Sequence, residues 1–193
     1  MRFRLRALVS PNMLSVYRIA LVPIFVIVYL VTDEHRWLAG VVFAIASLTD
    51  WLDGFLARRY GISTSFGAFL DPVADKLAVI AALVVLIGSF GSLLLTLPGL
   101  VIVGRELLIS SLREWMAEMN VRSKVAVNNL AKVKTFLQML AIFILLSNPP
   151  KLSLPLVIIG IVLMYFATLF TLWSLVVHMR AAWPTIRSEF FSK

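Results

Sequence analysis

The feature that most constrains this chain is a run of 28 consecutive uncharged residues from Leu77 to Gly104. About 20 apolar residues let a helix cross the hydrocarbon core of a bilayer, so this run is too long for a single crossing. The segment Gly88-Ser89-Phe90-Gly91-Ser92 lies near its middle and has the composition of a turn. The run therefore predicts two consecutive membrane helices joined by a tight turn.

The rest of the chain is similarly apolar. It is 61% hydrophobic and only 15% charged, whereas soluble domains are about 45–50% apolar, and so few charged residues could not cover a water-facing surface. We expect an all-α integral membrane protein with one transmembrane domain over residues 1–193. A basic interfacial segment at 1–11 should precede six transmembrane helices, at about 12–31, 36–60, 65–88, 93–119, 127–146 and 152–179.

The distribution of lysine and arginine predicts the orientation. Six spans place both termini on one side, and of 18 Lys and Arg only Arg36 and Lys151 fall on the other side, which leaves 16. Cationic connections face the cytosol, so we expect a multi-pass protein of the cytoplasmic (inner) membrane with cytosolic termini. The net charge of +8 then reflects orientation and contact with membrane lipids. With no separate basic domain, nucleic-acid binding is not expected.

Four aspartates lie inside the expected spans. Asp50 and Asp53 are three residues apart near the cytosolic end of the second, and Asp71 and Asp75 are four apart near the start of the third. Each pair shares a helix face. An ionised residue near mid-bilayer costs about 2.5–3.5 kcal/mol, so water, neighbouring cations or bound metal must compensate. Four carboxylates suit Mg²⁺ or Mn²⁺.

Such carboxylates also suit a divalent-cation transporter. A carrier would place them near the bilayer midplane, commonly between inverted repeats. Here they lie at one end of their spans, and the sequence shows no inverted repeat. An enzyme with its site at the cytosolic boundary is therefore the favoured interpretation.

The aspartates belong to a longer pattern: Asp50-x-x-Asp53-Gly54-x-x-Ala57-Arg58, eight further residues, then Gly67-x-x-x-Asp71-x-x-x-Asp75. It resembles the signature of the CDP-alcohol phosphatidyltransferase family at all eight fixed positions. The resemblance implies that family's fold, a homodimer, and two divalent ions, Mg²⁺ or Mn²⁺, held by the four aspartates, with Asp75 also the general base. It further implies a CDP site formed by Asn12, Gly54, Arg58, Thr64 and Gly67.

A cluster of cations bears on the acceptor. Six of them fall within thirty residues, and together they suit an acceptor that carries a phosphate. The competing interpretations are cytosolic loop charges and structural ion pairs, such as Arg105 with Glu106 or Arg113 with Glu114. The six are Arg105, Arg113, Arg122, Lys124, Lys132 and Lys134.

The same region carries a more specific resemblance. Val103-Gly104-Arg105-Glu106 and Ser123-Lys124-Val125-Ala126-Val127 resemble the branch of the family whose acceptor is glycerol 3-phosphate. That implies transfer of the phosphatidyl group from CDP-diacylglycerol to sn-glycerol 3-phosphate, with release of CMP, in the synthesis of phosphatidylglycerol and cardiolipin. Inositol phosphate, serine or a second lipid are the alternative acceptors, and charge alone does not exclude inositol phosphate.

Overall fold

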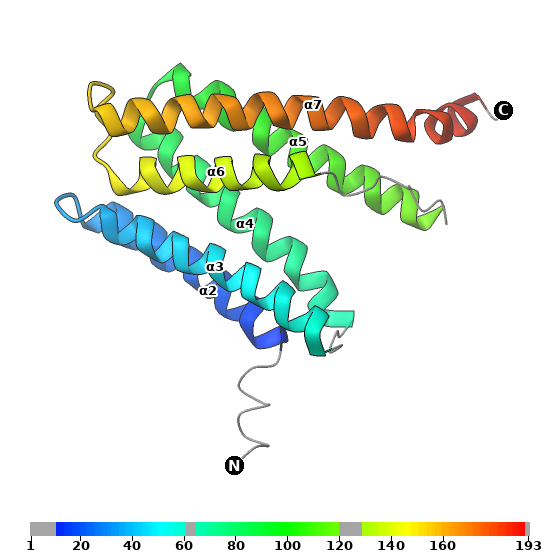
Figure 1. Ribbon diagram of the computed structural model, residues 1–193, viewed down its shortest axis with the longest axis horizontal. Helices are drawn as coiled ribbons and strands as arrows, with labels where there is room; N and C mark the ends of the chain where they lie inside the picture. The colour runs from blue at the N-terminus through cyan, green and yellow to red at the C-terminus, as the bar shows by residue number, and fades with distance from the viewer. Residues whose placement is uncertain (1–10, 61–64, 120–128, 192–193) are drawn as a thin grey trace, which may run out of the picture.

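The computed structural model describes residues 11–60, 65–119 and 129–191, and within these ranges it is all-helical. The expected all-α class is confirmed. Figure 1 shows the helices packed as one bundle. They are α2 (Pro11–Val31), α3 (Trp37–Tyr60), α4 (Ser65–Phe90), α5 (Leu93–Glu118), α6 (Asn129–Ser147) and α7 (Pro155–Phe191).

The arrangement of the helices separates two ends of the bundle. α2 and α3 pack side by side, α6 packs between α3 and α7, and α4 crosses the bundle to contact α2, α5 and α6 (Figure 1). The connections α2–α3, α4–α5 and α6–α7 lie toward the left of this view, whereas the end of α3 and the start of α4 lie at the lower right. The aspartate-bearing helix ends are thus far from those three connections.

The long uncharged run folds as its composition predicts, into two helices joined by a tight turn. α4 ends at Phe90, and Gly91 adopts a positive φ of 55°, which favours glycine because it has no Cβ. Ser92 then caps α5, its side chain accepting a hydrogen bond from the backbone N–H of Leu94 at 3.3 Å. Hydroxyl N-caps of this kind satisfy amide groups that have no partner within the helix.

The last helix is longer than expected. The sequence predicts a last span that ends at about residue 179, but α7 continues to Phe191. It continues through Pro184, and Ala182 in this extension is buried with 2% of its surface exposed. The predicted end was set by the point where the sequence becomes less apolar, but the helical backbone of α7 continues beyond that point.

Closely packed apolar side chains form the centre of the bundle. Phe25 of α2 meets Phe43 of α3 edge-on, with ring centroids 5.8 Å apart, a geometry that aromatic pairs favour. Fully buried Ile142 and Leu145 of α6 and Met164 of α7 extend this cluster. It holds the helices together around the interior.

Two glycines allow the helices to approach closely. A Cβ added to Gly40 of α3 would lie 2.0 Å from the Ser147 Oγ of α6, and one added to Gly160 of α7 would lie 2.9 Å from the Leu145 Cγ of α6. Both close contacts involve α6. Small residues serve this purpose at helix interfaces in membranes.

The outer surface identifies a membrane protein. Three described stretches are long and apolar enough to cross a bilayer, Pro72–Phe90, Leu93–Glu118 and Pro155–Glu189. The apolar parts found in α2, α3 and α6 are shorter, Val16–Val31, Trp37–Thr49 and Val133–Ser147. Large apolar side chains such as Leu100 and Leu169 are 67% and 62% exposed, which suits contact with lipid chains.

The Gly40 contact yields a stability prediction. Gly40→Leu should force α3 away from α6 and reduce the free energy of unfolding by about 1–3 kcal/mol, the usual effect of overpacking. Gly88→Leu is the matched control, since nothing lies within 4 Å of a Cβ at Gly88. Thermal unfolding of the purified protein in detergent measures both. Equal midpoints for the two variants would contradict the proposed close approach.

Candidate active site

A cavity of about 380 Å³ opens among five of the helices. Its charged lining comes from Arg18 of α2, Asp75 and Lys76 of α4, Glu106 of α5 and Lys134 of α6. Apolar side chains such as Val79 and Ile102, together with Ser47, Thr135 and Gln138, complete the wall. A hollow with mixed polar and apolar walls can accept a charged headgroup that carries apolar chains.

Asp75 is held at this cavity by an ion pair. Arg18, whose side chain is only 1% exposed, donates from Nη1 to the Asp75 Oδ1, and the Asp75 side chain is 44% exposed. The pair joins α2 to α4. A buried cation thus fixes a carboxylate whose surface still faces the cavity, as a group that exchanges a proton or binds a cation requires.

The other predicted metal ligands can be placed only by their backbones. Asp50 and Asp53 lie in α3, and Asp71 lies in α4 one turn before Asp75, but their side chains lie outside the described part of the structure. Among the described side chains, no three His, Cys, Asp or Glu residues are close enough together to hold a metal ion. The four-aspartate site therefore stays a prediction.

The predicted CDP-site residues are distributed over three helices. Asn12 lies in the first turn of α2, Gly54 and Arg58 lie in the second half of α3, and Gly67 lies in the first turn of α4. Thr64 lies outside the described residues, as do the side chains of Asn12 and Arg58. The backbone thus places four of the five on α2, α3 and α4, the helices that also supply Arg18, Ser47 and Asp75 to the cavity wall.

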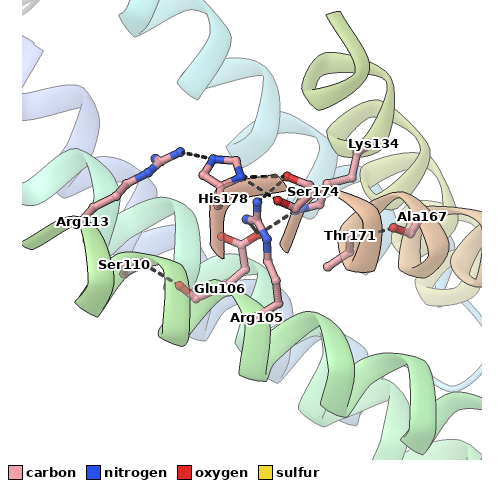
Figure 2. A network of polar contacts seen from close by, with 9 residues as sticks. All are labelled: Arg105, Glu106, Ser110, Arg113, Lys134, Ala167, Thr171, Ser174 and His178. Atoms are coloured by element: carbon pink, nitrogen blue, oxygen red, sulfur yellow. Dashed lines mark hydrogen bonds and ion pairs between the residues drawn. The ribbon is translucent and has the colours of Figure 1, made fainter. Parts of the chain in front are cut away.

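Glu106 is the centre of a second polar cluster, drawn in Figure 2. Its Oε1 accepts hydrogen bonds from the Arg105 Nη1 at 2.9 Å and from the Lys134 Nζ at 2.7 Å. The side chains of both cations are buried, 9% and 8% exposed, while that of Glu106 is 26% exposed. One carboxylate oxygen therefore links two buried cations and ties α5 to α6.

This cluster extends to α7. The Arg105 Nη2 donates to the Ser174 Oγ at 2.8 Å, and the Arg113 Nη2 lies 3.2 Å from the His178 Nε2 (Figure 2). Arginine can only donate, so this Nε2 must accept and the proton sits on Nδ1, which donates to the Ser174 carbonyl oxygen at 2.7 Å. His178 is thus fixed as a neutral ring between α5 and α7.

The predicted acceptor-binding cations therefore divide into groups. Lys134 lines the cavity, and Arg105 lies beside it through Glu106. Arg113 contacts His178. Lys132 lies in α6, its side chain outside the described part, and Arg122 and Lys124 lie outside the described residues.

Sequence reasoning placed the Arg105–Glu106 pair only as a competitor to acceptor binding, and it did not foresee Ser174 or His178. A serine and a histidine on a long apolar helix form no sequence pattern that indicates such a contact. The sequence did offer one energetic argument. A charged pair deep in an apolar helix needs polar partners from other helices, so polar residues on the helices packed against Arg105 were candidates for that role.

The arrangement brings groups of opposite charge to one cavity. Asp75 offers an oriented carboxylate that can bind a cation or take a proton. Lys134 at the cavity wall, with Arg105 beside it, offers buried positive charge to an anion. The Arg105 Nε is buried and makes no hydrogen bond to a described residue. Buried N–H groups of this kind are available to an anion.

Comparison with known proteins identifies relatives of this chain. The family model described as CDP-alcohol phosphatidyltransferase matches residues 8–173. A protein of Pseudomonas fluorescens named CDP-diacylglycerol–glycerol-3-phosphate 3-phosphatidyltransferase is 48% identical over 181 residues, covering 93% of this chain and 92% of its own length. The protein of the same name from Escherichia coli (strain K12) is 46% identical over 173 residues, covering 89% and 93%.

A solved structure has the same fold. The phosphatidylinositol phosphate synthase of Mycobacterium tuberculosis, crystallised in apo form, superposes with a TM-score of 0.65. The match covers 94% of this chain and 93% of that one at 18% identity. At that identity the likeness concerns the fold.

The α5–α7 contact yields the next prediction. Ser174→Ala should remove the Arg105 hydrogen bond and lower the free energy of unfolding by about 1.5 kcal/mol, since the donor is charged and buried. Thr171→Val is the matched control one turn earlier, because the Thr171 hydroxyl donates to the Ala167 carbonyl oxygen of its own helix (Figure 2). Thermal unfolding in detergent should show a lowered midpoint for the serine variant alone; equal shifts would argue against an interhelical role for Ser174.

Proposed function

The chain belongs to the CDP-alcohol phosphatidyltransferase family, and we propose that it transfers the phosphatidyl group of CDP-diacylglycerol to sn-glycerol 3-phosphate. The products are phosphatidylglycerophosphate and CMP, on the route to phosphatidylglycerol and cardiolipin. The observation that carries this proposal is the similarity, over about nine-tenths of both chains, to relatives named for that reaction.

The alternatives have less support. An inositol phosphate acceptor would agree with the name of the structural neighbour, but 18% identity supports only a shared fold. Membership of this family also accounts for the aspartates inside the predicted spans, so they give no separate support to a divalent-cation transporter. Glycerol 3-phosphate is therefore the acceptor we propose.

We propose that Asp50, Asp53, Asp71 and Asp75 hold two divalent ions, Mg²⁺ or Mn²⁺. The donor set fits, because four carboxylates from the end of α3 and the start of α4 supply the hard oxygen ligands that these ions prefer. One of them, Asp75, is already held at the cavity wall by Arg18. Bound there, the ions would neutralise the diphosphate of the donor and stabilise the departing CMP.

The residues of the chain would supply the proton transfer and the positioning. The acceptor hydroxyl attacks the phosphorus of the phosphatidyl group, forming one P–O bond while the P–O bond to CMP breaks. The hydroxyl proton passes to the Asp75 carboxylate, which acts as general base. We assign Asn12, Gly54, Arg58, Thr64 and Gly67 to the CDP moiety, because the motif that contains Gly54, Arg58 and Gly67 resembles the family signature.

For the acceptor phosphate, we propose Arg105 and Lys134 as principal ligands. Both are buried, and Lys134 lines the same cavity as Asp75. Charge-assisted donors in such a setting bind phosphate strongly. Arg113, Lys132, Arg122 and Lys124 would add positive charge at the same end of α5 and α6.

We further propose six membrane crossings over residues 1–193, with the interfacial segment 1–11, both termini and the active site on the cytosolic side of the inner membrane. The support is the distribution of Lys and Arg, 16 against 2. With this orientation the apolar chains of the donor remain in the bilayer while its headgroup reaches the cavity. Family membership supports a homodimer.

The reaction is tested with purified protein, CDP-diacylglycerol and Mg²⁺ or Mn²⁺, by measuring CMP release and identifying the lipid product. Glycerol 3-phosphate should be used far better than inositol phosphate or serine. Asp75→Asn should reduce turnover by at least about a hundredfold, since general base catalysis contributes on that order. The variant should stay folded with a lowered unfolding temperature, because it loses the charge opposite buried Arg18 but keeps an oxygen that can accept its hydrogen bond. Preferential use of inositol phosphate would overturn the proposed acceptor. Near-normal turnover of Asp75→Asn would overturn the assignment of Asp75 as the general base.

Topology is tested by cysteine labelling, for which a chain without native cysteine is suited. Ser63→Cys, in the connection between α3 and α4, should react with a membrane-impermeant maleimide only from the cytosolic side. Ser153→Cys is the matched control in the α6–α7 connection, and it should react only from the opposite side. The reverse pattern would contradict the proposed orientation.

A further inference from the structure

Glu106 occupies the position that an acceptor phosphate would need. Its Oε1 takes a hydrogen bond from each of the two proposed phosphate ligands, Arg105 and Lys134. The Arg105 Nη2 is engaged with Ser174. A phosphate that is to bind both cations therefore meets a carboxylate already bound to them (Figure 2).

The burial of the three side chains indicates which of them can move. Arg105 and Lys134 are 9% and 8% exposed, whereas Glu106 is 26% exposed and lines the cavity itself. Arg105 is further anchored to α7 by Ser174. The cations are therefore fixed, and the carboxylate has room on the cavity side.

We propose that Glu106 is an internal anion that competes with the acceptor's phosphate for Arg105 and Lys134. It occupies the cation pair before the acceptor enters, yields to the phosphate, and returns as the product leaves. This inference rests on the proposed function, in which these two cations hold the acceptor phosphate.

The physical need for such a competitor follows from the reaction. Without Glu106, two buried cations would face each other at close range, and like charges repel strongly away from water. The phosphate monoester of glycerol 3-phosphate is also retained in the product. A site that bound it without opposition would therefore hold the product as tightly as the substrate.

Inorganic phosphate is the probe that tests this competition without relying on catalysis. A ligand that binds only the folded state stabilises it by RT ln(1 + c/Kd), where c is the ligand concentration, so the rise of the unfolding temperature with phosphate concentration yields the Kd for phosphate. The Kd for phosphate, which is its half-saturating concentration, should fall about tenfold in Glu106→Gln, since a charge-assisted competitor is removed. Ionic strength is held constant with sodium chloride.

Two controls accompany the variant. Glu114→Gln changes an exposed carboxylate two turns further along α5 and should leave the half-saturating concentration unchanged. On a Lys134→Gln background the effect of Glu106→Gln should shrink, because one of the two cations under competition is gone. An undiminished effect there would contradict the role assigned to Lys134.

Turnover gives a second readout. In Glu106→Gln the KM for glycerol 3-phosphate should fall by a similar factor, while the KM for CDP-diacylglycerol stays unchanged. If Glu106 only positions Lys134, both the half-saturating phosphate concentration and the acceptor KM should rise instead, which would overturn the proposal. Should Glu106→Gln fail to fold, Glu106→Asp withdraws the carboxylate by one methylene and should shift both constants downward by a smaller factor; an upward shift would overturn the proposal equally.

The two proposals fail in different ways. Wild-type protein that binds inorganic phosphate but releases no CMP with glycerol 3-phosphate would sink the proposed reaction and leave the competition intact. Wild-type protein that makes phosphatidylglycerophosphate, with no gain in phosphate affinity in Glu106→Gln, would sink only the competition.

Discussion

Pairing of opposite charges between helices is the interaction on which the rest of this structure depends. An apolar bundle in a bilayer tolerates ionised side chains only where a partner, water or metal compensates. Here Arg18 joins α2 to α4 through Asp75, and Glu106 joins α5 to α6 through Lys134. Each ion pair holds a carboxylate at the cavity and connects two helices. The same interactions therefore hold the bundle together and build its cavity.

The cavity exists because the packing around it is uneven. Close helix contacts at Gly40 and Gly160 draw α3, α6 and α7 together, while the charged side chains of α2, α4, α5 and α6 surround a hollow of about 380 Å³. The bundle thus has a closely packed apolar region and a separate region where polar side chains surround the cavity. A lipid with a charged headgroup fits this division, since its chains and its diphosphate need opposite surroundings.

The helices could be predicted from the sequence because apolar run length and bilayer thickness are directly linked. The turn at Gly91 could be predicted because a segment rich in glycine and serine lies near the middle of an uncharged run that is too long for one crossing. The contacts of Glu106 could not. Arg105 adjoins it in the chain, but Lys134 is on another helix, and only tertiary packing brings it to 2.7 Å. Ser174 and His178 were missed for the same reason. Whether Asp50, Asp53 and Asp71 converge on Asp75 remains a prediction from spacing.

The length of α7 bears on how the protein sits in its membrane. Its 37 residues correspond to about 55 Å of helix, against a hydrocarbon core of ~30 Å. Even a tilt of about 40°, the upper end of what membrane helices show, would leave roughly ten residues outside that core. If the bilayer thickens or thins, the boundary between lipid and water moves along a helix that is continuous on both sides of it, and no unpaired backbone is exposed. This helix can therefore serve in bilayers of different thickness without refolding.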